Sequence, residues 1–154
     1  MSARTLPYSW YVDSHIYDRE QARVFGRYWQ YAGHTGQLPI EGGVNALAPT
    51  RVGNVPILLV RTDSDELRGF LNTCRHRGSE LISAEMCRST IQCPYHAWTY
   101  DLDGRLLSAP RSDGEDDFDH DSLGLIPVAV DCWGPFIFAN LDPGGTPLEE
   151  ALGI

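Results

Sequence analysis

The chain has 154 residues and a mass of 17.2 kDa, which is the size of a single domain with one hydrophobic core. Its 12 basic residues are all arginines and are outnumbered by 21 acids, so the formal net charge is -9. The lack of lysine excludes Schiff-base chemistry and lysine-dependent phosphate loops. The acidic balance argues against duplex nucleic acid as a partner, because nucleic-acid affinity comes largely from clustered cationic side chains.

No segment of the sequence is suited to a membrane or to secretion. The longest apolar run after Pro56 covers residues 57–60, far below the roughly 20 residues that span a bilayer. The first residues lack an apolar stretch long enough for a secretory signal. We therefore expect a cytoplasmic protein, in which the four cysteines are metal ligands or buried thiols and not disulfides.

The first predicted element is a short helix. Residues 18–21 can cap it, and it runs to about residue 30 with Ala22, Phe25 and Trp29 on one face. This spacing predicts a helix that packs against the rest of the domain.

From residue 44 onward the pattern changes to short β-branched or aromatic runs separated by Gly, Pro and Asp, which is typical of an antiparallel β domain. Residues 63–65 and 101–104 are predicted hairpin turns. Residues 112–121 hold six acids and are predicted to form a solvated loop with an exposed His120. Strands are predicted at residues 44–51, 55–61, 66–72, 96–100, 105–108, 125–130 and 135–140.

Two cysteine and histidine pairs are the chemically informative residues: Cys74 with His76, and Cys93 with His96. The pairs follow predicted strands at residues 70–73 and 89–92, so the two loops are expected at one end of a sheet. Two thiolates on one iron and two imidazoles on the other are the ligand set of a Rieske cluster. Zinc also accepts two Cys and two His, but its common fingers place the two Cys together and then the two His. The alternating order favours the iron-sulfur cluster, and a zinc-stabilised interaction module stays an alternative.

The two motifs, CRHRG at residues 74–78 and CPYHAW at residues 93–98, resemble the Rieske signature of ring-hydroxylating (aromatic) oxygenase α subunits. Residues 25–34 resemble the amino-terminal helix and first strand of that family. Residues 134–143 resemble the segment that closes its Rieske domain. The resemblance covers nearly the whole chain.

The resemblance implies a mainly β fold, an antiparallel Rieske-type [2Fe-2S] β-sandwich with a short N-terminal helix. It divides the chain into a helical lead-in (1–40), the Rieske domain (41–143) and the start of a linker toward an absent catalytic domain (144–154). That domain would hold a mononuclear Fe(II) with two His and a carboxylate. His15, His34 and His120 offer no such set here, so the chain alone is expected to be catalytically incomplete.

In this interpretation, the domain accepts electrons from a reductase or ferredoxin. It passes them to the iron of an oxygenase catalytic domain or neighbouring α subunit, for oxygen insertion into an organic, aromatic substrate. No nucleic acid and no membrane take part. A free-standing Rieske ferredoxin is the other electron-transfer alternative, although such carriers lack the long aromatic lead-in.

Residues around the motifs refine the prediction. Respiratory Rieske proteins carry an extra Cys in each motif loop, and these two cysteines form a disulfide. Tyr95 and Ala97 occupy the second-loop positions here, so that disulfide cannot form. The serine hydroxyl that bonds a cluster sulfur in those proteins is also missing, which predicts a potential near the low end of the Rieske range, about -150 mV. Possible outer contacts of the cluster are Arg75, Arg77, Tyr95 and Trp98. Cys87 and Cys132 are expected to be buried thiols without a ligand role.

Overall fold

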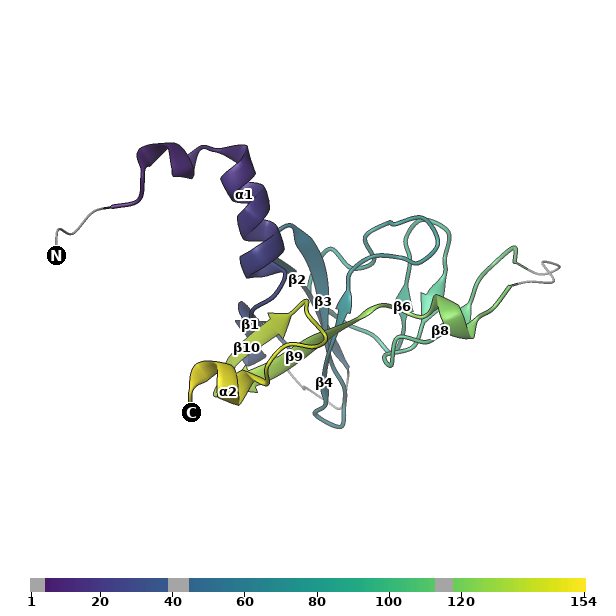
Figure 1. Cartoon of the computed structure of the whole chain (residues 1–154). Helices are drawn as coiled ribbons and strands as arrows, with labels where there is room; N and C mark the ends of the chain where they lie inside the picture. The colour runs from purple at the N-terminus through teal and green to yellow at the C-terminus, as the bar shows by residue number, and fades with distance from the viewer. Residues whose placement is uncertain (1–4, 39–44, 113–117) are drawn as a thin grey trace.

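Ten antiparallel strands build the molecule, which is a computed structural model that describes residues 5–38, 45–112 and 118–154 (Figure 1). One sheet has seven strands in the order β1-β10-β9-β4-β3-β2-β5, and the other has three in the order β6-β7-β8. The predicted mainly β, antiparallel fold is thereby confirmed. The strands are β1 (Gln30–His34), β2 (Ala46–Val52), β3 (Val55–Arg61), β4 (Leu67–Leu71), β5 (Met86–Cys87), β6 (Ile91–Gln92), β7 (Thr99–Tyr100), β8 (Leu106–Ser108), β9 (Pro127–Trp133) and β10 (Phe136–Asn140).

Most predicted strands and both predicted turns are present. β3 occupies the predicted residues, β4 is one residue shorter than predicted at each end, and β10 begins one residue later than predicted. The predicted strand at 96–100 is reduced to β7, because residues 93–98 form a closed loop instead. Three predicted features lie outside the described residues: the start of the first strand at residue 44, the boundary between the lead-in and the Rieske domain at 40/41, and the part of the acidic loop at 113–117.

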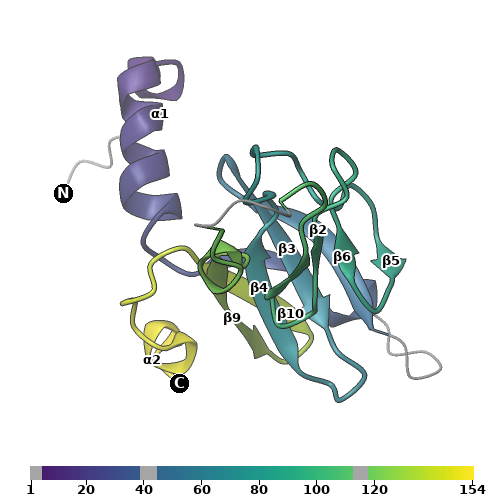
Figure 2. The ribbon, with the colours of Figure 1, turned by 90° about the vertical axis from the view of Figure 1, so that its right-hand side faces the viewer.

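The lead-in helix differs from its prediction. α1 (Ser14–Glu20) begins after Asp13, whose Oδ1 accepts the backbone N–H of His15 at 2.9 Å, so the cap is Asp13 and not residue 18. The helix continues as a π-helical turn, Gln21–Phe25, and ends at Gly26. Ala22 is exposed, but Phe25 packs against one of the hydrophobic clusters, so the expected packing face forms only in part. Figure 2 shows α1 standing beside the sheets.

The remaining helical segments are short. α2 (Leu148–Leu152) buries Leu148, and 3₁₀ turns lie at Tyr8–Tyr11, Thr35–Gln37 and Asp121–Leu123. Trp29 lies beyond the lead-in helix, and its indole N–H donates to the carbonyl of Thr146 at 2.7 Å. Among the described residues, no helix has the length and apolarity needed to cross a membrane.

The inner strand β3 is buried on both faces and separates two hydrophobic clusters. Its Leu58 and Val60 belong to the cluster beneath the two motif loops, whereas Ile57 and Leu59 belong to the cluster beneath β1 and β10. A strand with both faces covered is apolar along its length and not alternating, which explains the continuous run at residues 57–60.

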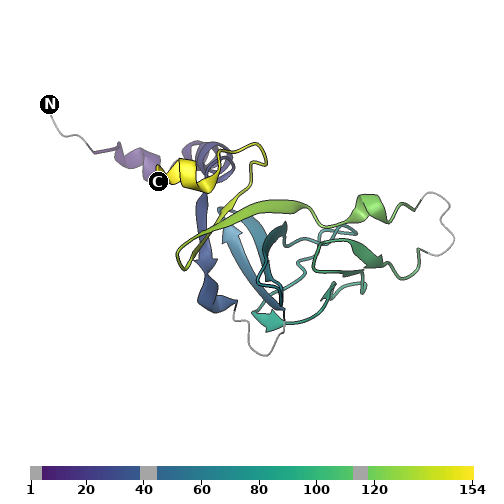
Figure 3. The same cartoon turned by 90° about the horizontal axis from the view of Figure 1, so that it is seen from below.

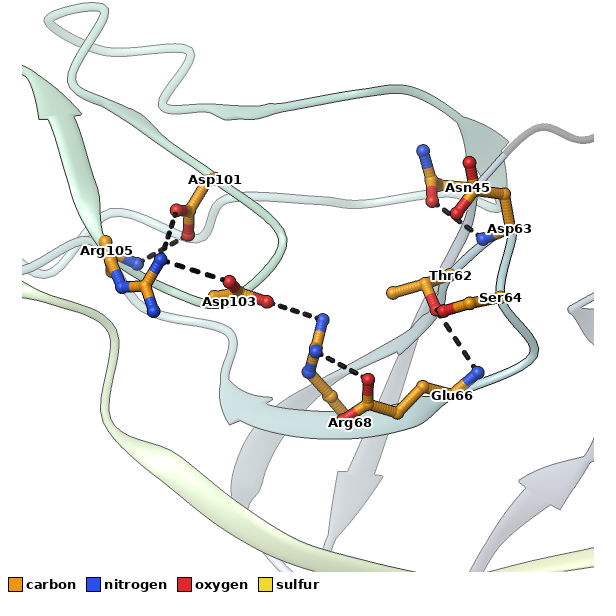
Figure 4. A network of polar contacts seen from close by, with 9 residues as sticks. All are labelled: Asn45, Thr62, Asp63, Ser64, Glu66, Arg68, Asp101, Asp103 and Arg105. Atoms are coloured by element: carbon orange, nitrogen blue, oxygen red, sulfur yellow. Dashed lines mark hydrogen bonds and ion pairs between the residues drawn. The ribbon is translucent and has the colours of Figure 1, made fainter.

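A polar network joins the β3–β4 hairpin to the β7–β8 turn (Figure 4). Arg68 lies between the two, bonding Glu66 at 2.6 Å and Asp103 at 2.7 Å. Arg105 extends the network to Asp101 and Asp103. Exposed ion pairs of this kind contribute little stability each, so the close packing of Gly104 against Phe70 is the stronger link between the two sheets.

We expect Gly104→Ala to destabilise the protein by about 3 kcal/mol. Gly104 has a φ of +85°, and a Cβ there would lie 2.6 Å from Cε1 of Phe70. Gly134→Ala is the matched control, since its φ is +56° but no atom lies within 4 Å of the added Cβ. The control should lose about 1 kcal/mol from backbone strain alone. Urea unfolding followed by circular dichroism measures both, and equal losses would contradict the packing role.

Candidate metal centre

The two motifs fold into loops with the same hydrogen-bond pattern. In the first, the N–H of Cys74 donates to the Ser79 carbonyl at 2.7 Å, and the N–H of Gly78 donates to the Cys74 carbonyl at 3.0 Å. In the second, the N–H of Cys93 donates to the Trp98 carbonyl at 2.8 Å, and the N–H of Ala97 donates to the Cys93 carbonyl at 3.1 Å. Each loop is therefore closed on its cysteine, which fixes the direction of the side chains that follow.

Both loops turn through a residue in the left-handed region four positions after the cysteine. Gly78 has a φ of +71° and Ala97 a φ of +60°. Glycine adopts this conformation freely, but alanine does so only at an energetic cost. A strained alanine held at the equivalent point of the second loop indicates that this loop geometry is maintained by its surroundings.

The four side chains form an inner and an outer pair. Cys74 and Cys93 are each only 3% exposed, and they lie near enough for each thiol to affect the pKa of the other. His76 and His96 are half-buried at the surface, with their Nδ1 atoms 3.2 Å apart. The predicted Cys and His residues are thus brought together, with sulfur inside and imidazole outside.

This pairing fits a two-metal group better than a single ion. Within the described parts of the chain, no three Cys, His, Asp or Glu side chains converge on one point that could hold a metal. A tetrahedral zinc site needs four donors around one centre. A [2Fe-2S] cluster needs two donors at each end and supplies its own bridging sulfides. The donor set and its separation into two pairs therefore fit such a cluster.

The electrostatics favour metal binding at Cys93 and His96, whereas burial opposes ionisation of Cys74. Burial raises the pKa of the Cys74 thiol. Burial acts in the same direction on Cys93, but backbone N–H groups of Tyr95 and His96 outweigh it and lower the pKa of that thiol. Desolvation, then the charges of His76, Arg77 and Arg111, lower the pKa of His96. A neutral imidazole and a readily ionised thiol are the protonation states that bind metal.

Comparison with known proteins identifies the family. The sequence matches the model of the Rieske [2Fe-2S] domain over residues 28–128. The chain belongs to the Rieske [2Fe-2S] domain family. The family implies the [2Fe-2S] cluster that the paired donors fit.

Two curated relatives of this Rieske domain are oxygenase subunits. It is 35% identical over 151 residues to the carnitine monooxygenase oxygenase subunit of Escherichia coli (strain K12), which covers 97% of this chain and 40% of that protein. It is 40% identical over 149 residues to the glycine betaine monooxygenase oxygenase subunit of Chromohalobacter salexigens, covering 96% of this chain and 33% of that protein. The chain thus spans well under half the length of these relatives.

Solved structures of similar proteins have the same fold. The quaternary ammonium Rieske monooxygenase CntA in complex with L-carnitine superposes with a TM-score of 0.85 at 33% identity, covering 95% of this chain and 41% of that one. Naphthalene 1,2-dioxygenase from Rhodococcus sp. bound to indole superposes with a TM-score of 0.81 at 31% identity, covering 92% of this chain and 32% of that one.

A buried tyrosine contacts the sulfur end of the Rieske site. Tyr100 is fully buried, and its hydroxyl lies 3.3 Å from Sγ of Cys74 while accepting the backbone N–H of Arg75 at 3.1 Å. A thiolate sulfur can only accept a hydrogen bond, so when Cys74 is ionised the hydroxyl of Tyr100 is the donor. Burial and then Cys74 raise the pKa of Tyr100 far above its usual value, so the hydroxyl stays protonated. The sequence prediction considered only a serine hydroxyl and missed this donor, which lies four residues after His96.

The two histidines are held by different aromatic side chains. Trp98, only 6% exposed, stacks on His76 with ring centroids 4.7 Å apart and planes 8° from parallel. Tyr95 is 61% exposed and stacks on His96 at 3.7 Å. Phe118 packs edge-on against Trp98, so the segment predicted as a solvated loop contributes one side chain to the site. His120 is exposed, as predicted.

The other cysteines do not have the predicted burial. Cys87 and Cys132 are both exposed. Cys87 lies on the two-residue edge strand β5, where Met86 packs against the core, so the next side chain faces outward. Cys132 lies near the outer end of β9, beyond the part of that strand that pairs with β4. Neither cysteine belongs to the inner thiol pair.

The cluster-free chain should show two fast and two slow thiols toward a reagent such as iodoacetamide. Cys87 and Cys132 are exposed, whereas Cys74 and Cys93 are buried in the closed loops. Partial burial and then Asp131 raise the pKa of Cys132, so its labelling should still accelerate above pH 9.0. Mass spectrometry of tryptic peptides over time measures each rate. Four equal rates would contradict the closed loops.

Proposed function

We propose that this chain is the electron-transfer domain of a Rieske oxygenase, with Cys74 and Cys93 holding one iron and His76 and His96 the other. The separation of four donors into a buried thiol pair and an outer imidazole pair carries this proposal. The bound cluster supplies one-electron transfer. The imidazole pair lies at the surface, so electrons enter and leave on that side.

The electron path follows from the relatives. One solved relative is described in terms of carnitine oxidation and inter-subunit electron transfer. We infer that a reductase or ferredoxin supplies electrons and that a mononuclear iron outside this chain receives them, in a catalytic domain or a neighbouring oxygenase subunit. The match to 33–40% of the two curated relatives supports an oxygenase portion over a free-standing ferredoxin.

The relatives favour a different substrate from the aromatic compound that the motif resemblance suggested. Curated oxygenase subunits named for carnitine, choline or glycine betaine are 35–40% identical to the chain. Among the solved structures, the quaternary ammonium monooxygenase CntA is 32–33% identical and the naphthalene dioxygenases are 28–31% identical. We therefore propose a quaternary ammonium compound as the substrate of the whole oxygenase. Product analysis of the whole oxygenase with carnitine, glycine betaine and naphthalene would test it, and oxidation of naphthalene alone would contradict it.

Anaerobically purified chain should be brown and contain two irons and two acid-labile sulfides. Cys74→Ser, His76→Ala, Cys93→Ser and His96→Ala should each lose most of the iron, because binding of the group is coupled to folding of the loops. Iron and sulfide analysis measures the loss.

Cys87→Ser and Cys132→Ser are the matched controls and should keep the full iron content, since both thiols lie outside the inner pair. Stoichiometric zinc without labile sulfide in the parent chain would support the zinc-module alternative. Equal iron loss in Cys87→Ser and Cys93→Ser would overturn the ligand assignment.

Tyr100→Phe should keep the cluster but lower its midpoint potential. The hydroxyl donates to the Cys74 sulfur, and this bond stabilises the more negative reduced state more than the oxidised one. A tenfold loss of that preference corresponds to about 59 mV for one electron. Tyr95→Phe, which removes an exposed hydroxyl, is the control and should leave the potential nearly unchanged. An optical redox titration compares them, and an unchanged or higher potential in Tyr100→Phe would contradict the hydrogen-bond role.

A further inference from the structure

An open depression lies in front of the two imidazoles. Its volume is about 750 Å³, and its wall includes His76, His96 and the exposed ring of Tyr95. Three arginines, Arg75, Arg77 and Arg111, also line it, and together they are named here the arginine rim. The depression therefore combines access to the cluster ligands with a concentration of positive charge.

This charge is opposite in sign to that of the chain as a whole. The chain has a net charge of -9, yet three of its 12 basic residues lie in the arginine rim. Within the parts of the chain that the structure describes, Arg61, Arg68 and Arg105 form ion pairs, whereas the rim arginines form none. No acid among the described residues lies within ion-pair distance of the rim.

Arg111 is held in the rim by strained backbone. Its φ is +70°, in the left-handed region that a long side chain occupies only at a cost. Arg77 and Arg111 come from loops far apart in the sequence, yet both lie near enough to His96 for their charges to act on the imidazole. A strained, exposed arginine aimed at the same depression as its neighbours is consistent with a binding role.

We propose that the arginine rim docks a carboxylate-rich surface of the protein that exchanges electrons with this domain. The inference rests on the proposed function and adds the chemistry of the partner. Charges farther away than about 10 Å, the Debye length at ordinary ionic strength, are largely screened, so the rim contributes strongly to the field that a group meets as it approaches the imidazoles. The acidic chain disfavours a nucleic acid as the alternative anion, because phosphates along a strand would also meet the surrounding negative charge.

Oxidation of the reduced, cluster-containing chain by small reagents tests the local charge. The reagents are iron(III)–EDTA, an anion, and hexaamminecobalt(III), a cation, and stopped-flow absorbance gives each second-order rate constant. If the rim determines the local charge, the rate constant for iron(III)–EDTA should fall about tenfold as the salt concentration rises. A net charge of -9 alone would make this rate constant rise. The ratio of the two constants is used because a change in midpoint potential affects both reagents in the same direction.

The rim variant carries Arg75→Gln, Arg77→Gln and Arg111→Gln. Its anion-to-cation rate ratio should fall about tenfold at low salt, and the salt dependence for the anion should reverse. The matched control carries Arg19→Gln, Arg23→Gln and Arg27→Gln, an equal change of charge on the exposed lead-in. Figures 1 and 3 show the lead-in and the β6–β8 loops at opposite ends of the molecule, so the control should keep the ratio. Arg111→Gln alone, remote in sequence from the ligands, covers the case in which the triple variant fails to load iron.

Competition identifies the kind of anion. A glutamate-rich peptide should slow oxidation by iron(III)–EDTA more than a thymidine oligonucleotide of equal charge. Stronger competition by the oligonucleotide would overturn the carboxylate assignment. An anion rate that rises with salt in the parent chain, or an equal effect of the rim and control variants, would overturn the rim itself. Lack of a [2Fe-2S] absorption spectrum before any rate is measured would instead overturn the proposed function on which the inference rests.

Discussion

The reciprocal hydrogen bonds that close each loop on its own cysteine are the constraint on which the site depends. They place both thiols inward and both imidazoles outward, although the two motifs differ by one residue in the spacing from Cys to His. The left-handed Gly78 and Ala97 complete the same turn in both. A bridged two-iron cluster needs this division of donors, whereas a single zinc ion needs four donors at one point.

The packing of the two sheets brings these loops together. The first loop follows β4 of the large sheet, and the second joins β6 and β7 of the small one. Phe70, Leu58 and Tyr100 belong to the hydrophobic cluster beneath both loops, and Gly104 lets the small sheet approach Phe70 closely. Tyr100 then serves two purposes, since its ring fills this core and its hydroxyl reaches the sulfur of Cys74.

As a result, the two ends of the site have different surroundings. Its sulfur end is buried and bonded by Tyr100, while its imidazole end opens on a depression lined by arginine in an acidic chain. Trp98 covers His76 from inside, and Tyr95 covers His96 from outside. This arrangement keeps solvent away from the thiols and leaves the imidazoles open to a partner, which is what a relay of single electrons between proteins requires.

The sequence by itself determined the two cysteine–histidine motifs, the two turns and the strand β3, because those features depend on residue type and short spacing. It also contained Asp13, an N-cap residue directly before α1 that the helical periodicity concealed. Only the tertiary structure decided that Cys87 and Cys132 face outward, that Tyr100 meets Cys74, and that Arg111 joins Arg75 and Arg77 at one rim. These contacts join residues that are distant in the chain or depend on the position of a strand in its sheet. Their formation is set by how two sheets pack, which no local pattern records.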